Sequence, residues 1–433
     1  MRRLHLPILL LLLLVLGACL PASASAAVAR PSSLWLNSVG THAASIRWVP
    51  VTGARLYDVR HGTRRIALMR GTSLLVRGLL PATYQQYTVT TIGAGGARSV
   101  ATDPLPVVTR ASTACTHFVS TRGSDAARGS ESAPWRTLTR LVDAWRPGWV
   151  GCVSGDFVED VSIRRGGQGT SKVTLRAWPG SRASVRGRLW IADGADHVVV
   201  SGLRLDGRAL DDTNRDSLPS PTINGDFAML LGNDISNAGT RVCVVLGSIR
   251  GYGTTSATTL AYNRVHDCGQ RGVNTHHGIY VESADATRIV HNVIADNADR
   301  GIQLYPNAQR SIIIGNLIQG NGEGIIFSGA EGYASSRNKV LGNVIAGSEL
   351  RSNLEHYWEA PSRPGVGNIA TRNCLGGAAQ GDIALPTSGY VARGNVSGVL
   401  RYRNAAAGDF RLTAGSGCAS FLRSGPLPLA PFG

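Results

Sequence analysis

The sequence of 433 residues predicts an all-β chain in which a small β-sandwich precedes a long coil of short parallel strands. Three features carry this prediction. Charged residues make up only 17% of the chain while glycine occurs 53 times, a balance that favours strands and turns over helices. Residues 31–110 alternate apolar and polar side chains between regular turn signals. Beyond them, asparagine and glycine recur within a repeating unit of roughly two dozen residues.

The first 26 residues have the three parts of a secretory signal peptide. Two arginines precede an apolar core at 6–16, and residues 24–26 (ASA) fit the cleavage site. The apolar core is too short to span a membrane. Residues 16–19 (LGAC) resemble a bacterial lipoprotein box, in which Cys19 would become a lipidated N-terminus. We therefore expect an exported protein, secreted or, alternatively, anchored at the cell surface through Cys19.

Six cysteines remain after removal of the signal peptide. An even number in an exported chain is typical of disulfide bonds, although sequence alone does not fix the pairing. No cysteine has the spacing of a zinc site, so no zinc is expected. We expect each cysteine to pair with its neighbour along the chain, as Cys115–Cys152, Cys243–Cys268 and Cys374–Cys418.

The formal net charge of +16 comes almost entirely from arginine. Such a charge suits an anionic partner, for example an acidic polysaccharide, a membrane surface or nucleic acid. A general bias toward arginine codons would give the same composition. The arginines are scattered without a long basic run, so no nucleic-acid binding is expected.

Residues 31–110 carry aromatic residues in a familiar order. "ASIRWVPV" contains Trp48, "RLYDVRHG" contains Tyr57, and "LLPATYQQYTV" follows. This order resembles a fibronectin type III domain, with Trp48 as its buried strand-B tryptophan and Tyr57 as its strand-C tyrosine. The resemblance makes Tyr84 or Tyr87 the corner tyrosine, whose hydroxyl bonds upstream backbone. It implies core packing for these rings and a spacer or carbohydrate-contact role for the domain.

An internal repeat dominates the rest of the chain. Short lines such as "HNVIADN" and "GNLIQGN" recur, most with a strand before the asparagine and another about nine residues later. No ten-residue helical pattern fits between them, so the unit predicts a parallel β-helix with three short strands per coil. Asparagine suits the turns because it tolerates left-handed backbone and can bond along a ladder. The repeated asparagines are Asn233, Asn263, Asn292, Asn316, Asn343, Asn373 and Asn395.

The segment 115–433 resembles the right-handed parallel β-helix family, which includes pectate lyases, other polysaccharide lyases and polygalacturonase-like hydrolases. "FVSTRGSD" and the helical spacing from Trp135 to Trp145 look like its N-terminal cap, and "YRNAAAGDFRLTAGS" looks like a closing coil. The predicted fold class is therefore all-β: a fibronectin type III-like sandwich, then a right-handed parallel β-helix with a short N-terminal capping helix. Fold alone does not fix function.

Four strands that follow the turns can be aligned as "HHGIYVE", "DRGIQLY", "GEGIIFS" and "SNLEHYW". Strand alternation directs the apolar side chains of the first three inward, namely Ile279, Val281, Ile302, Leu304, Ile325 and Phe327. Three outward columns then lie on one face: Tyr280, Gln303, Ile326 and Glu355; Glu282, Tyr305, Ser328 and Tyr357; and His277, Arg300 and Glu323.

These columns contain ionisable groups, aromatic rings and a cation, as a site for a sugar chain requires. For a lyase, we expect His277 or Tyr280 to be the base and Arg300 to hold a uronate carboxylate. A hydrolase needs two carboxylates, and the candidate pairs are Glu282 with Glu323 or Glu355. The expected substrate contacts are His276, Gln303, Tyr305, Tyr357 and Trp358.

Structural explanations compete with these roles. His276 and His277 could cap the turn, Glu323 could pair with Arg300, and strand glutamates are often only solvated. The sequence therefore predicts a monomeric protein with a polysaccharide partner, enzymatic as a lyase or hydrolase. The alternative is a non-catalytic polysaccharide-binding or cell-surface protein.

One polar insertion, "LDGRALDDTNRDSLPSPTINGD", suggests a second kind of ligand. Clustered carboxylates are the usual partners of calcium, although the spacing matches no EF-hand loop. Arginines within the insertion favour a solvated loop instead. Calcium is the one cofactor the sequence suggests, and its candidate ligands are Asp206, Asp211, Asp212, Asp216 and Asp226.

Overall fold

A computed structural model describes residues 28–208, 210, 219–407 and 409–418. The expected signal peptide with Cys19 lies outside these residues. So do three of the suggested calcium ligands, Asp211, Asp212 and Asp216. No helix within the described part of the chain has the length and apolar character needed to cross a membrane.

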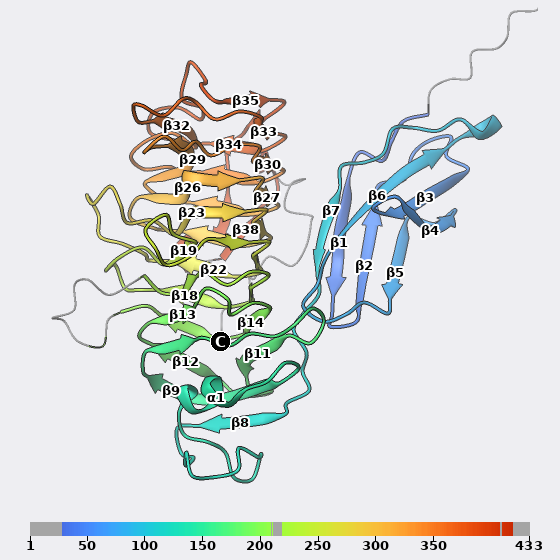
Figure 1. Cartoon of the computed structure of the whole chain (residues 1–433). Helices are drawn as coiled ribbons and strands as arrows, with labels where there is room; N and C mark the ends of the chain where they lie inside the picture. The colour runs from blue at the N-terminus through green and yellow to red at the C-terminus, as the bar shows by residue number, and fades with distance from the viewer. Residues whose placement is uncertain (1–27, 209, 211–218, 408, 419–433) are drawn as a thin grey trace, which may run out of the picture.

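The N-terminal part is a β-sandwich of two antiparallel sheets (Figure 1). One sheet has the order β1 (Leu34–Val39), β2 (Ala43–Trp48) and β5 (Ser73–Arg77). The other has the order β4 (Arg64–Met69), β3 (Leu56–His61), β6 (Tyr84–Ile92) and β7 (Leu105–Val108), with a 3-10 turn η1 (Ala94–Gly96) before β7. Trp48 and Tyr57 pack edge to face in the core, with ring centroids 5.5 Å apart, and Tyr87 is buried beside them. Alternating apolar residues thus form the sandwich core, as predicted.

The rest of the chain is a right-handed parallel β-helix, in which each coil contributes strands to three parallel sheets. The first sheet contains β8 (His117–Ser120), β9 (Val150–Val158), β11 (Val173–Ala177), β14 (Val198–Ser201), β17 (Met229–Leu231), β21 (Thr259–Ala261), β24 (Arg288–Val290), β27 (Ile312–Ile314), β30 (Lys339–Leu341), β33 (Asn368–Thr371) and β35 (Tyr390–Arg393). The second contains the end of β9, β12 (Ala183–Arg186), β15 (Arg204–Asp206), β18 (Asp234–Ser236), β22 (Arg264–His266), β25 (Val293–Ala295), β28 (Leu317–Gln319), β31 (Val344–Ala346), β34 (Cys374–Gly376) and β36 (Val396–Ser397).

The third sheet carries the candidate site. It contains β10 (Val161–Ile163), β13 (Leu189–Ile191), β16 (Thr222–Ile223), β19 (Val244–Leu246), β23 (Ile279–Asp285), β26 (Arg300–Gln309), β29 (Glu323–Gly329) and β32 (Leu354–Trp358), with β20 (Thr255–Ser256) paired beside β23. Its inward side chains are fully buried, including Ile279, Ile302 and Ile325. The predicted inward alternation is therefore confirmed.

The asparagine ladder forms as predicted. Each side-chain amide nitrogen donates to the side-chain oxygen of the asparagine one coil later, at 2.9–3.1 Å from Asn233 to Asn395. Each also donates to a backbone carbonyl, as Asn316 does to Ile289 at 2.8 Å. A second ladder joins Asn297 to Asn321 at 2.8 Å. Because buried amides need partners, the first ladder satisfies the asparagine side chains of successive coils from Asn233 to Asn395 at the same turn.

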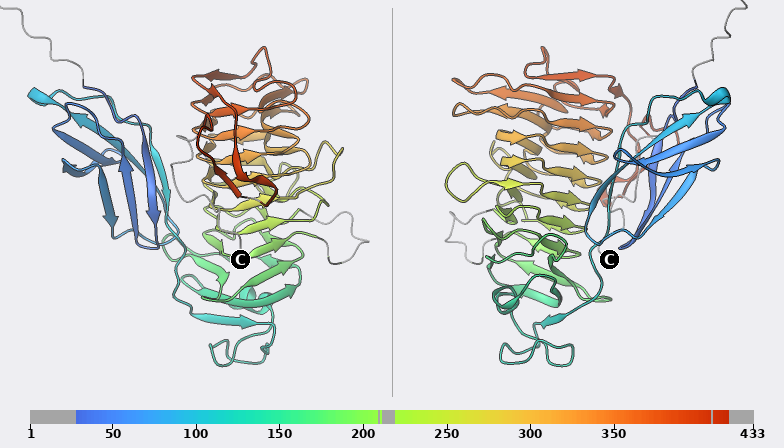
Figure 2. Two further views of the ribbon diagram at one scale, coloured as in Figure 1. Left: turned by 180° about the vertical axis from the view of Figure 1, so that it is seen from behind. Right: turned by 45° about the vertical axis from the view of Figure 1, so that its right-hand side comes forward.

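The sandwich packs against the first sheet of the β-helix, and one hydrophobic cluster includes residues of both (Figure 2). The hydroxyl of Tyr262 donates to the carbonyl of Val108 at 2.9 Å, and the Arg110 guanidinium lies 4.5 Å from the Tyr262 ring. Tyr84 faces the same contact, where Arg288 lies 4.6 Å from its ring. The sandwich therefore covers part of the outer face of the first sheet and leaves the outer face of the third sheet open.

The two ends of the β-helix differ. At the N-terminal end, α1 (Leu138–Ala144) begins at Thr137, whose hydroxyl accepts from the amide of Arg140, and it buries its apolar side as predicted. At the C-terminal end the predicted closing coil is wrong. The segment forms an antiparallel hairpin of β37 (Tyr402–Asn404) and β38 (Asp409–Leu412), with a 3-10 turn η2 (Ala405–Ala407), that lies along the second sheet.

The hairpin takes this position because the second sheet has an apolar outer face. Phe410 packs there in one cluster with Val293, Leu317 and Val344. The Cys374–Cys418 disulfide holds the following segment to the same face. Burial of this apolar surface favours the hairpin over another coil. All three disulfides, including Cys115–Cys152 and Cys243–Cys268, join the neighbours expected from sequence.

Candidate functional site

A cleft of about 840 Å³ lies on the outer face of the third sheet. Strands β23, β26, β29 and β32 form its floor, and the segments 247–252 and 274–277 form its walls. It brings together eight of the eleven catalytic and substrate-contact candidates identified from sequence: His277, Tyr280, Glu282, Arg300, Gln303, Tyr305, Glu355 and Tyr357.

The predicted first column is confirmed by the strand register. Tyr280 pairs with Gln303, Gln303 with Ile326, and Ile326 with Glu355. The second column is interrupted, because the register of β23 and β26 shifts between Val281 and Ser283. Glu282 lies in this shift and has no in-register partner. The rings of Tyr280 and Tyr305 nevertheless stack, with centroids 6.3 Å apart.

The third column is a network of buried charges, in which His277 and Arg300 reach the cleft and Glu323 lies beneath it. Nδ1 of His277 lies 3.0 Å from Oδ2 of Asp299 but is not aligned as a hydrogen bond. Arg300 lies between two carboxylates, with Nη1 2.7 Å from Asp299 and Nε 3.1 Å from Glu323. Arg351 contacts the same two carboxylates, with its Nε 2.9 Å from Glu323. Two guanidinium groups and two carboxylates therefore surround one histidine.

Burial keeps this histidine uncharged. His277 is only 3% exposed, and desolvation lowers its pKa to about 4 despite the nearby Asp299. Burial acts to raise the pKa of Asp299, but His277 and the two arginines outweigh it, so the net shift is downward. A carboxylate facing Nδ1 favours a proton on that nitrogen. Nε2 is then the unprotonated nitrogen available to the cleft.

Glu323 behaves differently from Asp299. It is completely buried, and desolvation raises its pKa to about 7, even though Arg300 and Arg351 favour its charged form. It does not line the cleft. Its position matches the ion-bridge alternative foreseen from sequence, in which Glu323 pairs with Arg300.

Two further ionisable groups face the cleft from β23. Desolvation raises the pKa of Tyr280, with Glu282 and Tyr305 adding to the shift, so its hydroxyl keeps its proton. Burial also raises the pKa of Glu282, against bonds that its carboxylate accepts from the amide of Ile249 at 3.1 Å and from Ser248. Burial therefore favours the protonated form of both groups.

Three of the predicted residues lie away from the cleft. They are Glu323, His276 and Trp358. Nδ1 of His276 accepts a hydrogen bond from the amide of Gln270 at 3.0 Å, as the turn-capping alternative predicts. Nε1 of Trp358 donates to the carbonyl of Ser388 at 3.1 Å. Neither His276 nor Trp358 lines the cleft.

Sequence reasoning missed several residues of this region. Asp299 directly precedes Arg300 in "NADRG", and its position beside the third column was the available signal. Arg351 comes from the turn before β32, and nothing in the repeat indicates that it reaches the cleft, where its side chain is 27% exposed. Arg250 and Glu331 also line the cleft and form an ion pair at 3.2 Å between segments 81 residues apart.

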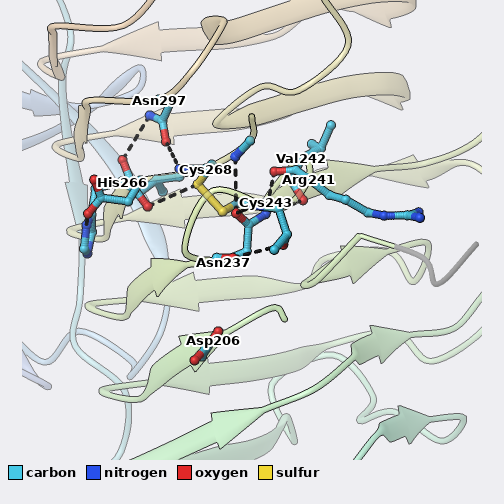
Figure 3. Close-up of a disulfide and its surroundings, with 12 residues drawn as sticks. Asp206, Asn237, Arg241, Val242, Cys243, His266, Cys268 and Asn297 are labelled. Atoms are coloured by element: carbon cyan, nitrogen blue, oxygen red, sulfur yellow. Dashed lines mark hydrogen bonds and ion pairs between the residues drawn. A yellow bond between two sulfur atoms is a disulfide. The ribbon is translucent and has the colours of Figure 1, made fainter. Parts of the chain in front are cut away.

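An extended turn, residues 269–278, delivers His277 and is held at both ends. Figure 3 shows the disulfide at the start of the turn, with Asn297 beside Cys268. At its start, the amide of Cys268 donates to Asn297 at 3.1 Å, and Cys268 is bonded to Cys243. At its end, the carbonyl of His277 accepts from the amide of Cys243 at 3.1 Å. The disulfide therefore clamps the base of the turn that positions His277.

Replacing Cys243 and Cys268 together with serine is expected to lower the free energy of unfolding by about 3 kcal/mol, because the lost bond closes a loop of 25 residues. Amide hydrogen exchange across 269–278 should accelerate. The control replaces Cys115 and Cys152, whose bond lies at the N-terminal cap. Equal exchange of 269–278 in both variants would show that the clamp does not act on the turn.

The family model described as "Periplasmic copper-binding protein (NosD)" matches residues 218–377, less than half of the chain. No curated protein matches the chain in sequence. Among solved structures, the family 28 exopolygalacturonase of Yersinia enterocolitica has 12% identity, covers 86% of each chain and gives a TM-score of 0.45.

Two lyase structures are also similar. Pectate lyase Pel9A has 12% identity and a TM-score of 0.45, with 70% of this chain and 92% of that chain covered. An alginate lyase from a Paenibacillus species has 17% identity and a TM-score of 0.39, with 60% and 92% covered. Similarity at this level carries no information about activity.

The residues that the structure describes do not suit copper, the metal named by that family model. Copper prefers histidine, cysteine and methionine ligands. All six cysteines of the described chain are in disulfides, and within those residues no group of three or more His, Cys, Asp or Glu side chains is arranged to hold an ion. Of the suggested calcium ligands that are described, Asp206 pairs with Arg208, and Asp226 accepts from the amide of Ser256 at 2.7 Å.

Proposed function

We propose that this chain is an exported, carbohydrate-active protein that cleaves an acidic polysaccharide by β-elimination in the cleft of the third sheet. The observation that carries the proposal is the uncharged His277, backed by Asp299 and placed beside two guanidinium groups. A base that is neutral at physiological pH and a cluster of cations are what proton abstraction next to a carboxylate requires.

In this proposal Nε2 of His277 takes the proton from the carbon that bears the uronate carboxylate. The electron pair left on that carbon forms a double bond to the neighbouring ring carbon, and the bond from that neighbour to the glycosidic oxygen breaks. The leaving oxygen takes a proton from the hydroxyl of Tyr280, whose ring centroid lies 5.8 Å from that of His277. No water is consumed. Of the two base candidates from sequence, Tyr280 thus becomes the acid, because its raised pKa preserves its proton.

The guanidinium groups stabilise the charge that develops on the substrate carboxylate. Arg351 is better placed than Arg300 to touch it, since its side chain is 27% exposed while that of Arg300 is 8% exposed. When Glu323 is protonated, the two arginines face only one charged carboxylate, Asp299, and one positive charge remains for the substrate. The raised pKa of Glu323, about 7, makes this form accessible near neutral pH.

Hydrolysis is the less favoured chemistry. Glu282 and Glu355 both line the cleft, but they lie on β23 and β32, three strand steps apart. At about 4.8 Å per step this separates them by roughly 14 Å, beyond the roughly 5–10 Å between the carboxylates of glycosidases. Glu323 is buried below the floor. A non-catalytic polysaccharide-binding protein is the remaining alternative.

The pH dependence of cleavage follows from His277. The base is active only when neutral, so kcat/KM should stay high as pH falls through 6.5, the ordinary histidine pKa, and drop as pH falls through about 4. The measurement is a pH–rate profile with a polyuronate of constant charge above pH 5. An acidic limb centred near 6.5 would contradict a buried, uncharged His277.

A substrate panel tests the proposed function. Purified protein is incubated with several polyuronates and a neutral glucan, and both ultraviolet absorbance of unsaturated uronates and new reducing ends are followed. We expect both signals from at least one polyuronate and neither from the glucan. Reducing ends without absorbance would favour hydrolysis. The absence of both signals with every polymer would favour the non-catalytic alternative.

The N-terminal segment fits this role as an accessory module. We infer a fibronectin type III-like domain over 31–110, with the β-helix domain over 115–433 and a signal peptide over 1–26. The order of strands in the two sheets and the packing of Trp48 on Tyr57 support this inference. The predicted corner tyrosine, Tyr84 or Tyr87, does not support it. The hydroxyl of Tyr84 accepts from the side chain of Gln86, and among the described residues neither hydroxyl bonds upstream backbone. Three disulfides support export to an oxidising compartment.

A further inference from the structure

The first column continues beyond the cleft toward the N-terminal end of the β-helix. Tyr280 pairs in register with Val245, Val245 with Thr222, and Thr222 with Trp190 on β13. Trp190 is thus three strand steps from Tyr280, or roughly 14 Å at about 4.8 Å per step. Val245 and Thr222 belong to the cleft lining, so the surface between the two rings is continuous.

Trp190 is held as a fixed ring on this surface. It is half-buried, and its Nε1 donates to Oδ1 of Asn224 at 2.9 Å. The amide nitrogen of Asn224 in turn donates to the carbonyl of Gly253 at 2.6 Å. Tyr252, which lines the cleft, packs edge-on against Trp190 with centroids 6.3 Å apart. An aromatic ring fixed in this way presents a face at low entropic cost.

Two guanidinium groups lie over the ring in cation–π contacts. The Cζ atoms of Arg164 and Arg188 lie 5.2 and 5.9 Å from the Trp190 ring. Within the described residues neither arginine forms an ion pair, and Nε of Arg188 is buried without a hydrogen-bond partner. Asp160 accepts only from the backbone amide of Arg188, at 2.6 Å, and Nη2 of Arg188 donates to the hydroxyl of Ser162 at 3.5 Å. The charges of both side chains are therefore available to an anion.

We propose that Trp190, Arg164 and Arg188 form a second sugar subsite, which stacks one ring of a polyuronate and pairs with its carboxylate. This inference rests on the proposed function, because it assigns the same polysaccharide to a longer track along the third sheet. Aromatic stacking and arginine–carboxylate pairing are the two interactions that recognise an acidic sugar. Bound here, the chain extends from the cleft toward the N-terminal cap.

The test measures binding separately from cleavage. In a His277→Gln background, affinity for a long and a short oligouronate is compared with and without Trp190→Ala, where the short oligomer fills only the cleft. We expect the Trp190 change to weaken the long oligomer about tenfold or more and to leave the short one unchanged. Trp35→Ala, in strand β1 of the sandwich, is the matched control and should change neither.

A second variant, Arg164→Gln with Arg188→Gln, keeps the ring and removes the charge. It should weaken the long oligouronate but not its methyl-esterified form, and a sulfated oligomer bound as tightly as the uronate would assign the subsite to anions in general. Equal affinity for the long oligomer in all variants, or equal weakening of both lengths, would overturn the subsite. If Trp190-dependent binding persists while the unmodified protein cleaves no polyuronate, only the proposed catalytic function fails.

Discussion

Replacing His277 with glutamine is expected to lower kcat on a cleavable polyuronate by about 10²–10⁴-fold, the usual contribution of a general base. Glutamine fills most of the ring's volume but accepts no proton. KM should change only a few-fold, because the proposed sugar contacts, Tyr305 and Tyr357, remain in place. Initial rates at saturating and limiting substrate separate the two constants.

The matched control is His61→Gln, a histidine of the sandwich that packs on Tyr87. It should retain the unmodified rate. Circular dichroism and thermal unfolding should show both variants folded. A folded His277→Gln protein with undiminished kcat would remove His277 from the reaction and leave the base to another residue of the cleft.

Replacing Arg300 with methionine is expected to lower the free energy of unfolding by about 3–5 kcal/mol. Methionine keeps much of the length of the side chain but leaves Asp299 and Glu323 with Arg351 as their remaining guanidinium. Because Glu323 is fully buried, its loss of a partner is not compensated by water. Chemical denaturation followed by tryptophan fluorescence measures the change.

Two comparisons separate this effect from loss of a side chain. Arg310→Met breaks an exposed pair with Asp285 and should cost less than about 1 kcal/mol. Adding Glu323→Gln to Arg300→Met removes the uncompensated charge and should restore part of the loss. If Arg300→Met costs no more than Arg310→Met, the buried network is not a significant source of stability.

Much of the site could be predicted because the β-helix repeats. The glycines before Ile279, Ile302 and Ile325 set a common register, and strand alternation then predicts which side chains face outward. The same repetition predicted the asparagine ladder from Asn233 to Asn395. Periodicity therefore placed most of the cleft floor without any knowledge of the loops.

The remainder could not be predicted because it depends on departures from the repeat. The register shift at Glu282 directs its carboxylate to Ile249, which strand alternation does not foresee. The turn 269–278 buries His277, so the third column became an internal charge network rather than an exposed surface. Arg351 enters this network from a turn whose direction no pattern specifies.

The fate of water during cleavage tests the central claim most directly. A polyuronate is digested in water enriched in heavy oxygen, and the products are weighed by mass spectrometry. Elimination at His277 predicts fragments whose masses sum to that of the substrate, with an unsaturated end and no heavy oxygen incorporated by the cleavage itself. Fragments that together exceed the substrate by one labelled water per cut would show hydrolysis and contradict the proposed mechanism.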